Sequence, residues 1–174
     1  MNGLIYLNIS GLFYIVLVLI SFYCKKRTNN LEQKIYSKLI MVSFLELIIG
    51  LVTTLTMYYS KNNLLVTILS KVYFLTILLW IATFSQYMYG LFKNRISKIL
   101  IVFTIIFCLL VLVLPLNPIM IETTITADGL SLYALYIGTF FFDFICIIYG
   151  IKFLCSSKHF DKKLIPLCIF LLLG

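Results

Sequence analysis

Acidic residues and histidine are scarce in this chain, which has six Asp and Glu and one His among 174 residues. Five cysteines are present, but their spacings include no CxxC pair. Metal centres, disulfide frameworks and acid–base catalysis require clusters of these residue types. We therefore expect no metal site, no catalytic centre and no cofactor in this chain.

Charged residues of either sign are also rare, at 11% of the sequence, whereas hydrophobic residues make up 63%. A typical soluble domain contains about 25% charged residues. A water-soluble fold of this composition could not cover its apolar surface with polar groups. The composition predicts a protein whose main partner is the lipid bilayer, located in the cell membrane as a multi-pass protein.

A net charge of +8 is compatible with nucleic-acid binding, but that interaction needs basic residues gathered on one face of a folded domain. Here twelve of the fourteen Lys and Arg residues lie in three clusters between apolar runs, which excludes a nucleic-acid partner. Basic loops remain on the cytoplasmic side of a membrane, so the N-terminus is expected outside. The clusters are Lys25, Lys26, Arg27, Lys34 and Lys38; Lys93, Arg95 and Lys98; and Lys152, Lys158, Lys162 and Lys163.

The apolar runs predict an all-α bundle of transmembrane helices with no soluble domain. A helix of about 20 residues crosses the hydrocarbon core of a bilayer. The last run is too short for this, since its residues would rise only about 16 Å, and we expect a fragment that ends within its sixth span. Five full spans are predicted at 4–24, 39–59, 64–92, 99–114 and 131–155, followed by a partial span at 164–174.

One longer polar stretch, Asn117 to Gly129, is expected on the outer side. Pro115 and Pro118 end the helix before it. The stretch carries Glu122 and Asp128 and contains no Lys or Arg. These two acidic residues are the candidate external sensing residues.

Three ionisable residues, Glu46, Lys71 and Asp143, lie inside predicted spans. Charges in hydrocarbon are costly, so such residues normally face the interior of the bundle and have partners. Small and polar residues recur beside them at helical spacing, which predicts that the second, third and fifth spans meet at a polar seam. The candidate seam residues are Glu46, Lys71, Ser85, Gln86 and Asp143.

The depth of these residues favours an ion pair between Lys71 and Asp143. Their distances from the outer helix ends differ by about four residues, or about 6 Å, which a lysine side chain can bridge. Glu46 lies deeper and is expected to bond to Ser or Thr neighbours or to be neutral. The alternative for all three is a purely structural contact that fixes helix register.

Three segments resemble the N-terminal membrane region of bacterial sensor histidine kinases. They are KKRTNNLEQKIYSKLIMVSF from residue 25, LSKVYFLTILLWIATFSQYMYGLF from residue 69 and ADGLSLYALYIG from residue 127. The resemblance implies a homodimeric input region that acts on a cytoplasmic response regulator through later kinase domains. This chain lacks the phosphoacceptor and ATP-binding segments, so no catalytic residue is carried over.

The leading functional hypothesis is therefore the sensory input region of a two-component histidine kinase, present without its kinase domain. An alternative is a small transporter or channel component in which the same buried charges line a solute path. A vestigial membrane anchor is the third possibility. Transporters usually contain internal repeats and helices interrupted at mid-membrane, and the sequence has neither.

Overall fold

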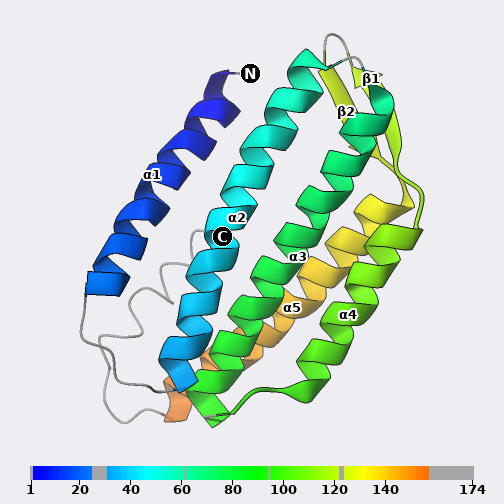
Figure 1. Cartoon of the computed structure of the whole chain (residues 1–174). Coiled ribbons are helices and arrows are strands. Elements are labelled where there is room, and N and C mark those ends of the chain that lie inside the picture. Colours follow the sequence, from blue (N-terminus) through cyan, green and yellow to red (C-terminus); the bar gives the residue numbers. More distant parts are fainter. Residues whose placement is uncertain (1, 25–30, 61, 94, 122–123, 157–174) are drawn as a thin grey trace.

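The computed structural model describes residues 2–24, 31–60, 62–93, 95–121 and 124–156. Within these ranges the chain forms a helix bundle with one small hairpin (Figure 1). The predicted all-α class is confirmed, apart from the hairpin. The elements are α1 (Asn2–Cys24), α2 (Leu31–Tyr59), α3 (Asn63–Lys93), α4 (Lys98–Val113), β1 (Asn117–Ile121), β2 (Thr124–Asp128) and α5 (Leu130–Ser156).

The central element of the bundle is α3, which packs against α2, α4 and α5. Helix α1 packs on α2 at one side (Figure 1). Consecutive helices run antiparallel (Figure 1). The starts of α1, α3 and α5 therefore lie at the end of the bundle that carries the hairpin, and the starts of α2 and α4 lie at the opposite end (Figure 1).

Three helices are long and apolar enough to cross a membrane: Leu31–Tyr59, Asn63–Leu91 and Leu130–Lys152. They correspond to the second, third and fifth predicted spans. Shorter apolar helical stretches are found at Asn8–Cys24 and Lys98–Val113. The 16 residues of α4 rise only about 24 Å, less than the 30 Å hydrocarbon core. The predicted partial span at 164–174 lies outside the described residues.

Helix α2 begins at Leu31, well before the predicted start at residue 39. The segment 31–38 was expected to be a connector because it contains charged and amide side chains. Its residues nevertheless favour helix, and Ile35 is buried with only 5% of its surface exposed. The side chain of Ile35 lies against Gly90 near the end of α3. This packing extends α2 by two turns beyond its apolar run.

The predicted outer stretch forms an antiparallel hairpin in which Asn117 pairs with Asp128 and Ile121 with Thr124. Alternating Ile and Thr residues favour extended structure because β-branched side chains pack well on a pleated surface. Strand β2 contacts α2, α3 and α5, and β1 contacts α3. The hairpin is therefore packed onto the ends of three helices.

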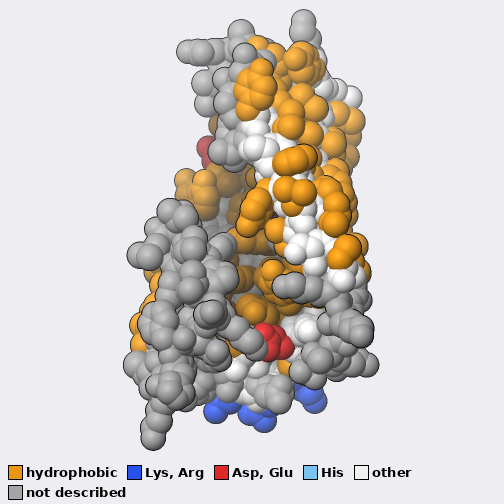
Figure 2. Space-filling model, turned by 90° about the vertical axis from the view of Figure 1, so that its left-hand side faces the viewer, with side chains coloured by type: hydrophobic (Ala, Val, Ile, Leu, Met, Phe, Trp, Pro, Cys, Tyr) orange, Lys and Arg blue, Asp and Glu red, His pale blue; other side chains and the backbone are white. Residues whose placement is uncertain are grey.

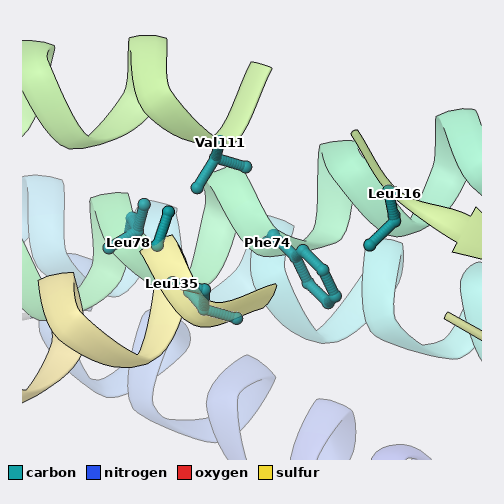
Figure 3. Packing of buried hydrophobic residues seen from close by; sticks show 6 residues of the cluster. Phe74, Leu78, Val111, Leu116 and Leu135 are labelled. Carbon is teal, nitrogen blue, oxygen red and sulfur yellow. The ribbon is translucent and has the colours of Figure 1, made fainter. Parts of the chain in front are cut away.

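A buried cluster joins α3, α4 and α5 below the hairpin. It contains Phe74 and Leu78 of α3, Val111 of α4, Leu135 of α5 and Leu116, which precedes β1 (Figure 3). Gly138 of α5 allows close approach here, since a Cβ at this position would lie 2.8 Å from Leu78 Cδ2. These contacts fix the distance between α3 and α5.

The outer surface of the bundle is largely apolar. Large hydrophobic side chains are exposed along α1, α4 and α5, including Phe13, Val113 and Phe140. Figure 2 shows such side chains covering much of one face, with basic side chains at one end. An exposed apolar surface of this extent indicates contact with lipid or with other apolar partners.

Gly129 allows a direct test of the turn between β2 and α5. Its φ is +142°, and a Cβ would lie 2.7 Å from the carbonyl oxygen of Pro115. We expect Gly129→Ala to reduce the free energy of unfolding by about 1–3 kcal/mol, because backbone at this contact cannot move aside cheaply. Thermal unfolding of the purified protein in detergent measures the loss.

Gly11→Ala is the matched control for this substitution. Its Cβ would meet only the side-chain tip of Leu47, at 3.2 Å, and alanine favours helix. A melting temperature that falls equally in both variants would contradict the strained turn.

Candidate functional site

Basic residues gather at one end of the bundle. Lys34 and Lys38 lie in the first turns of α2, Lys93 ends α3, and Lys98 begins α4. Lys152 lies near the end of α5, which reaches the same end of the bundle (Figure 1). The described members of the three sequence clusters therefore meet in space at the end opposite the hairpin. Lys71 differs from these residues, because it lies in the third turn of α3, towards the hairpin end.

The Lys71 side chain caps the C-terminal end of α4. Its Nζ donates to the carbonyl oxygens of Leu112, at 2.8 Å, and Leu114, at 2.9 Å. Ser131 Oγ at the start of α5 donates to the carbonyl of Val111, at 2.9 Å. The last carbonyls of a helix have no partner within the helix and carry partial negative charge. A cation and a hydroxyl from two other helices satisfy them here.

The predicted ion pair between Lys71 and Asp143 is wrong. Within the described part of the chain, Lys71 makes its hydrogen bonds to α4 backbone carbonyls, and Asp143 takes part in no hydrogen bond or ion pair. Lys71 instead bonds backbone carbonyls at the end of α4, while Asp143 is exposed on α5.

Gln86 holds the other end of α4. Its Nε2 donates to the carbonyl of Ser97, at 2.8 Å, and its Oε1 accepts from the Ser97 amide, at 3.0 Å. Ser97 is the N-cap of α4, and its side chain accepts a hydrogen bond from the Leu100 amide. Both polar groups of the Gln86 side chain are therefore used to position the first turn of α4.

Lys71 and Gln86 together form what we call the α4 clamp. They are separated by 15 residues on α3, or about 22 Å, which matches the roughly 24 Å length of α4. The antiparallel arrangement places each one beside the end of α4 that it bonds. Helix α3 thus fixes both ends of α4 through side chain–backbone hydrogen bonds.

Ser85 links α3 to α5. Its hydroxyl donates to the carbonyl of Ile81, at 2.9 Å, and lies 3.2 Å from both the carbonyl oxygen of Phe142 and Cys146 Sγ. The side chain is fully buried. The predicted polar contact between the third and fifth helices is therefore present at Ser85, although Asp143 takes no part in it.

Polar side chains also link α2 to α3. Glu46 of α2 lies close to Tyr73 of α3. Trp80 Nε1 donates to Ser43 Oγ, at 2.8 Å. The predicted seam is thus a set of separate contacts that each join α3 to one neighbouring helix. A single cluster of Glu46, Lys71 and Asp143 does not form.

Asp143 lies on the exposed surface of α5 rather than in the interior. Its neighbours on this surface include Phe140, Phe144 and Ile147, which are also exposed. The 100° spacing of residues along a helix groups side chains on a face, but it does not say which face is inside. The expectation that Asp143 faces the bundle interior is therefore wrong for the described helices.

Of the two candidate external sensing residues, Asp128 belongs to the described part of the chain. Asp128 is exposed, and its Oδ1 accepts a hydrogen bond from the Gly129 amide, at 2.7 Å, which stabilises the turn into α5. Glu122 lies outside the described residues. Across the described ranges, no group of three or more His, Cys, Asp and Glu side chains could hold a metal ion.

Sequence reasoning missed three of the partner residues: Tyr73, Trp80 and Ser131. Tyrosine and tryptophan are expected at membrane interfaces for reasons unrelated to bonding, which conceals their roles here. Ser131 is easier to recognise in the sequence, because it follows Gly129 closely and begins the fifth predicted span. In the structure its amide donates to the carbonyl of Pro115.

A double-mutant cycle tests the role of Lys71. Lys71→Met should lower the free energy of unfolding by about 1.5–3 kcal/mol, because carbonyls lose a charged donor. Adding Asp143→Asn should give a coupling energy within about 0.5 kcal/mol of zero, because the two side chains do not interact. Equilibrium unfolding in detergent measures all four proteins.

Ser131→Ala provides the matched positive control, since Ser131 and Lys71 bond the same turn of α4 and should couple. A Lys71–Asp143 coupling energy of about 1 kcal/mol or more would support the ion pair and contradict the capping of α4 by Lys71.

Comparison of the chain with protein-family models, with curated proteins and with solved structures gives no match in any of the three. Its function therefore has to be argued from the contacts described above.

Proposed function

We propose that the chain is a multi-pass protein of the cell membrane with its N-terminus outside. Three helices of sufficient length and hydropathy support insertion, as do the exposed apolar side chains of α1, α4 and α5. The basic end of the bundle supports the orientation, because Lys and Arg are retained on the cytoplasmic side. In this proposal α1 and α4 also span, and residues 164–174 begin a sixth span.

We further propose that the chain is the sensory input region of a two-component histidine kinase. The observation that carries this proposal is the position of the hairpin, which rests on the outer ends of α2, α3 and α5. Directly beneath it, Lys71 of α3 bonds the end of α4. A ligand that binds the hairpin would therefore act on the helix that fixes both ends of α4.

The signal in this proposal is a shift between two arrangements of the bundle. A ligand changes that equilibrium only through a difference in its affinity for the two states. Hydrogen bonds between a side chain and a helix end suit such a shift, because each bond is either made or broken when the helices move. Helix α5 would pass the change to the cytoplasmic side, as part of a homodimer whose kinase domains address a response regulator.

The transporter or channel alternative receives less support from the geometry. Lys71 is bonded to the end of α4, Glu46 lies close to Tyr73, and Asp143 is on the outer surface of α5. A solute path through the monomer would need such groups to face a shared cavity. Within the described residues, these three side chains do not face a shared cavity. Sensing is therefore the better-supported proposal.

Thiol accessibility tests the orientation. In a variant without native cysteines, Asn62→Cys and Asp128→Cys should react with a membrane-impermeant thiol reagent on intact cells, because both residues are exposed at the hairpin end. Lys34→Cys and Arg95→Cys should react only after the cells are permeabilised. Labelling of Lys34→Cys on intact cells, with protection of Asn62→Cys, would contradict the orientation.

A chimera tests the signalling role. When the chain precedes the cytoplasmic core of a histidine kinase, Lys71→Met should change basal autophosphorylation several-fold, because it releases α3 from α4. Lys34→Gln is the matched control, since Lys34 is exposed and lies outside the clamp. Equal output from both variants and the parent, at equal membrane levels, would count against an input role.

A further inference from the structure

A groove of about 360 Å³ lies on the surface of the bundle between α2, α3 and α4. It is near the basic end, since Ile35 and Lys38 belong to the first turns of α2 and Ile96 precedes α4. Helix α3 forms its floor, because both flanking helices pack on α3. The lining residues are Ile35, Lys38, Leu79, Ala82, Thr83, Gln86, Ile96, Ile101, Thr104 and Ile105.

The polar side chains in this groove, apart from Lys38, are already bonded within the protein. Thr83 Oγ1 donates to the carbonyl of Leu79, at 2.6 Å, and Thr104 Oγ1 donates to that of Leu100, at 2.7 Å. Gln86 uses both ends of its amide on the Ser97 backbone. The groove therefore offers an apolar surface of methyl and methylene groups.

Lys38 is the exception to this pattern. Its side chain is exposed at the basic end of the groove, and it makes no hydrogen bond or ion pair with any residue in the described ranges. The groove thus combines an elongated apolar wall with one available cation at its end. An occupant that suits it has an apolar chain and an anionic head.

We propose that this groove binds an anionic phospholipid, with one acyl chain between α2 and α4 and the phosphate on the Lys38 ammonium. The inference rests on the membrane location proposed above, but not on the signalling role. The volume lies within the range of small-molecule sites, about 300–1,000 Å³. A cytoplasmic leaflet supplies anionic headgroups at the level of the basic end.

The charge of the groove favours an anionic lipid over an uncharged apolar occupant, because Lys38 is the one charged side chain among the described residues that line it. An acyl chain is narrow enough to lie along the groove, and a bound lipid would contact Gln86, which holds the start of α4. Lipid composition would in this way influence the α4 clamp.

Native mass spectrometry of the purified chain in detergent tests the site. Phosphatidylglycerol should bind at least tenfold more tightly than phosphatidylcholine with the same acyl chains. Lys38→Gln should remove most of this preference, whereas Lys34→Gln should keep it, because Lys34 is exposed on the same helix but does not line the groove. Both lysines are exposed, so neither change should disturb folding.

A second pair of variants tests the acyl-chain part of the site. Ile101→Trp should narrow the groove and weaken phosphatidylglycerol binding about tenfold. Val102→Trp is the matched control, since Val102 is also exposed on α4, at 55% against 44% for Ile101, but is not part of the lining. Near-ultraviolet circular dichroism checks that each variant retains its packing.

Equal binding of the two lipids, equal effects of Lys38→Gln and Lys34→Gln, or equal effects of Ile101→Trp and Val102→Trp would each overturn the proposal. The membrane orientation is tested separately by thiol labelling. Correct labelling without selective lipid binding would reject the lipid site alone, and reversed labelling would reject the orientation whatever the lipid result.

Discussion

The carbonyl groups at the end of a helix need donors, and in an apolar environment water cannot supply them. In this chain the donors for α4 come from Lys71 and Ser131, on two other helices. The arrangement of α3, α4 and α5 below the hairpin depends on these bonds. The cation on α3 is favourable here because the C-terminal end of a helix carries partial negative charge.

A second set of polar bonds fixes the opposite end of α4 through Gln86 and the Ser97 backbone. Between the two ends, the contacts of α4 with α3 and α5 are apolar and include Val111 and Phe107. Apolar packing alone sets few constraints on helix register where the surrounding medium is also apolar. The end bonds therefore specify the position of α4, and they explain why polar residues occur on an otherwise hydrophobic α3.

Composition and helical spacing were sufficient to predict the helical class and, among the five predicted full spans, the three that are long and apolar enough to cross a membrane. They were also sufficient to identify Lys71, Ser85 and Gln86 as packed polar residues. The partners were not predictable in the same way. Lys71 bonds a backbone carbonyl, which every residue possesses, and Asp143 faces outward on a helix whose sequence is apolar around its circumference. The hairpin was missed because its short strands resemble a polar loop.

The most direct measurement of the α4 clamp is amide hydrogen exchange across α4 in the variant that combines Lys71→Met with Gln86→Leu. If α3 fixes both ends of α4, exchange at both ends of α4 should accelerate at least about tenfold, while exchange in α2 stays unchanged. Unchanged protection of α4 in a folded double variant would contradict the clamp. The position of α4 would then be due to apolar packing alone.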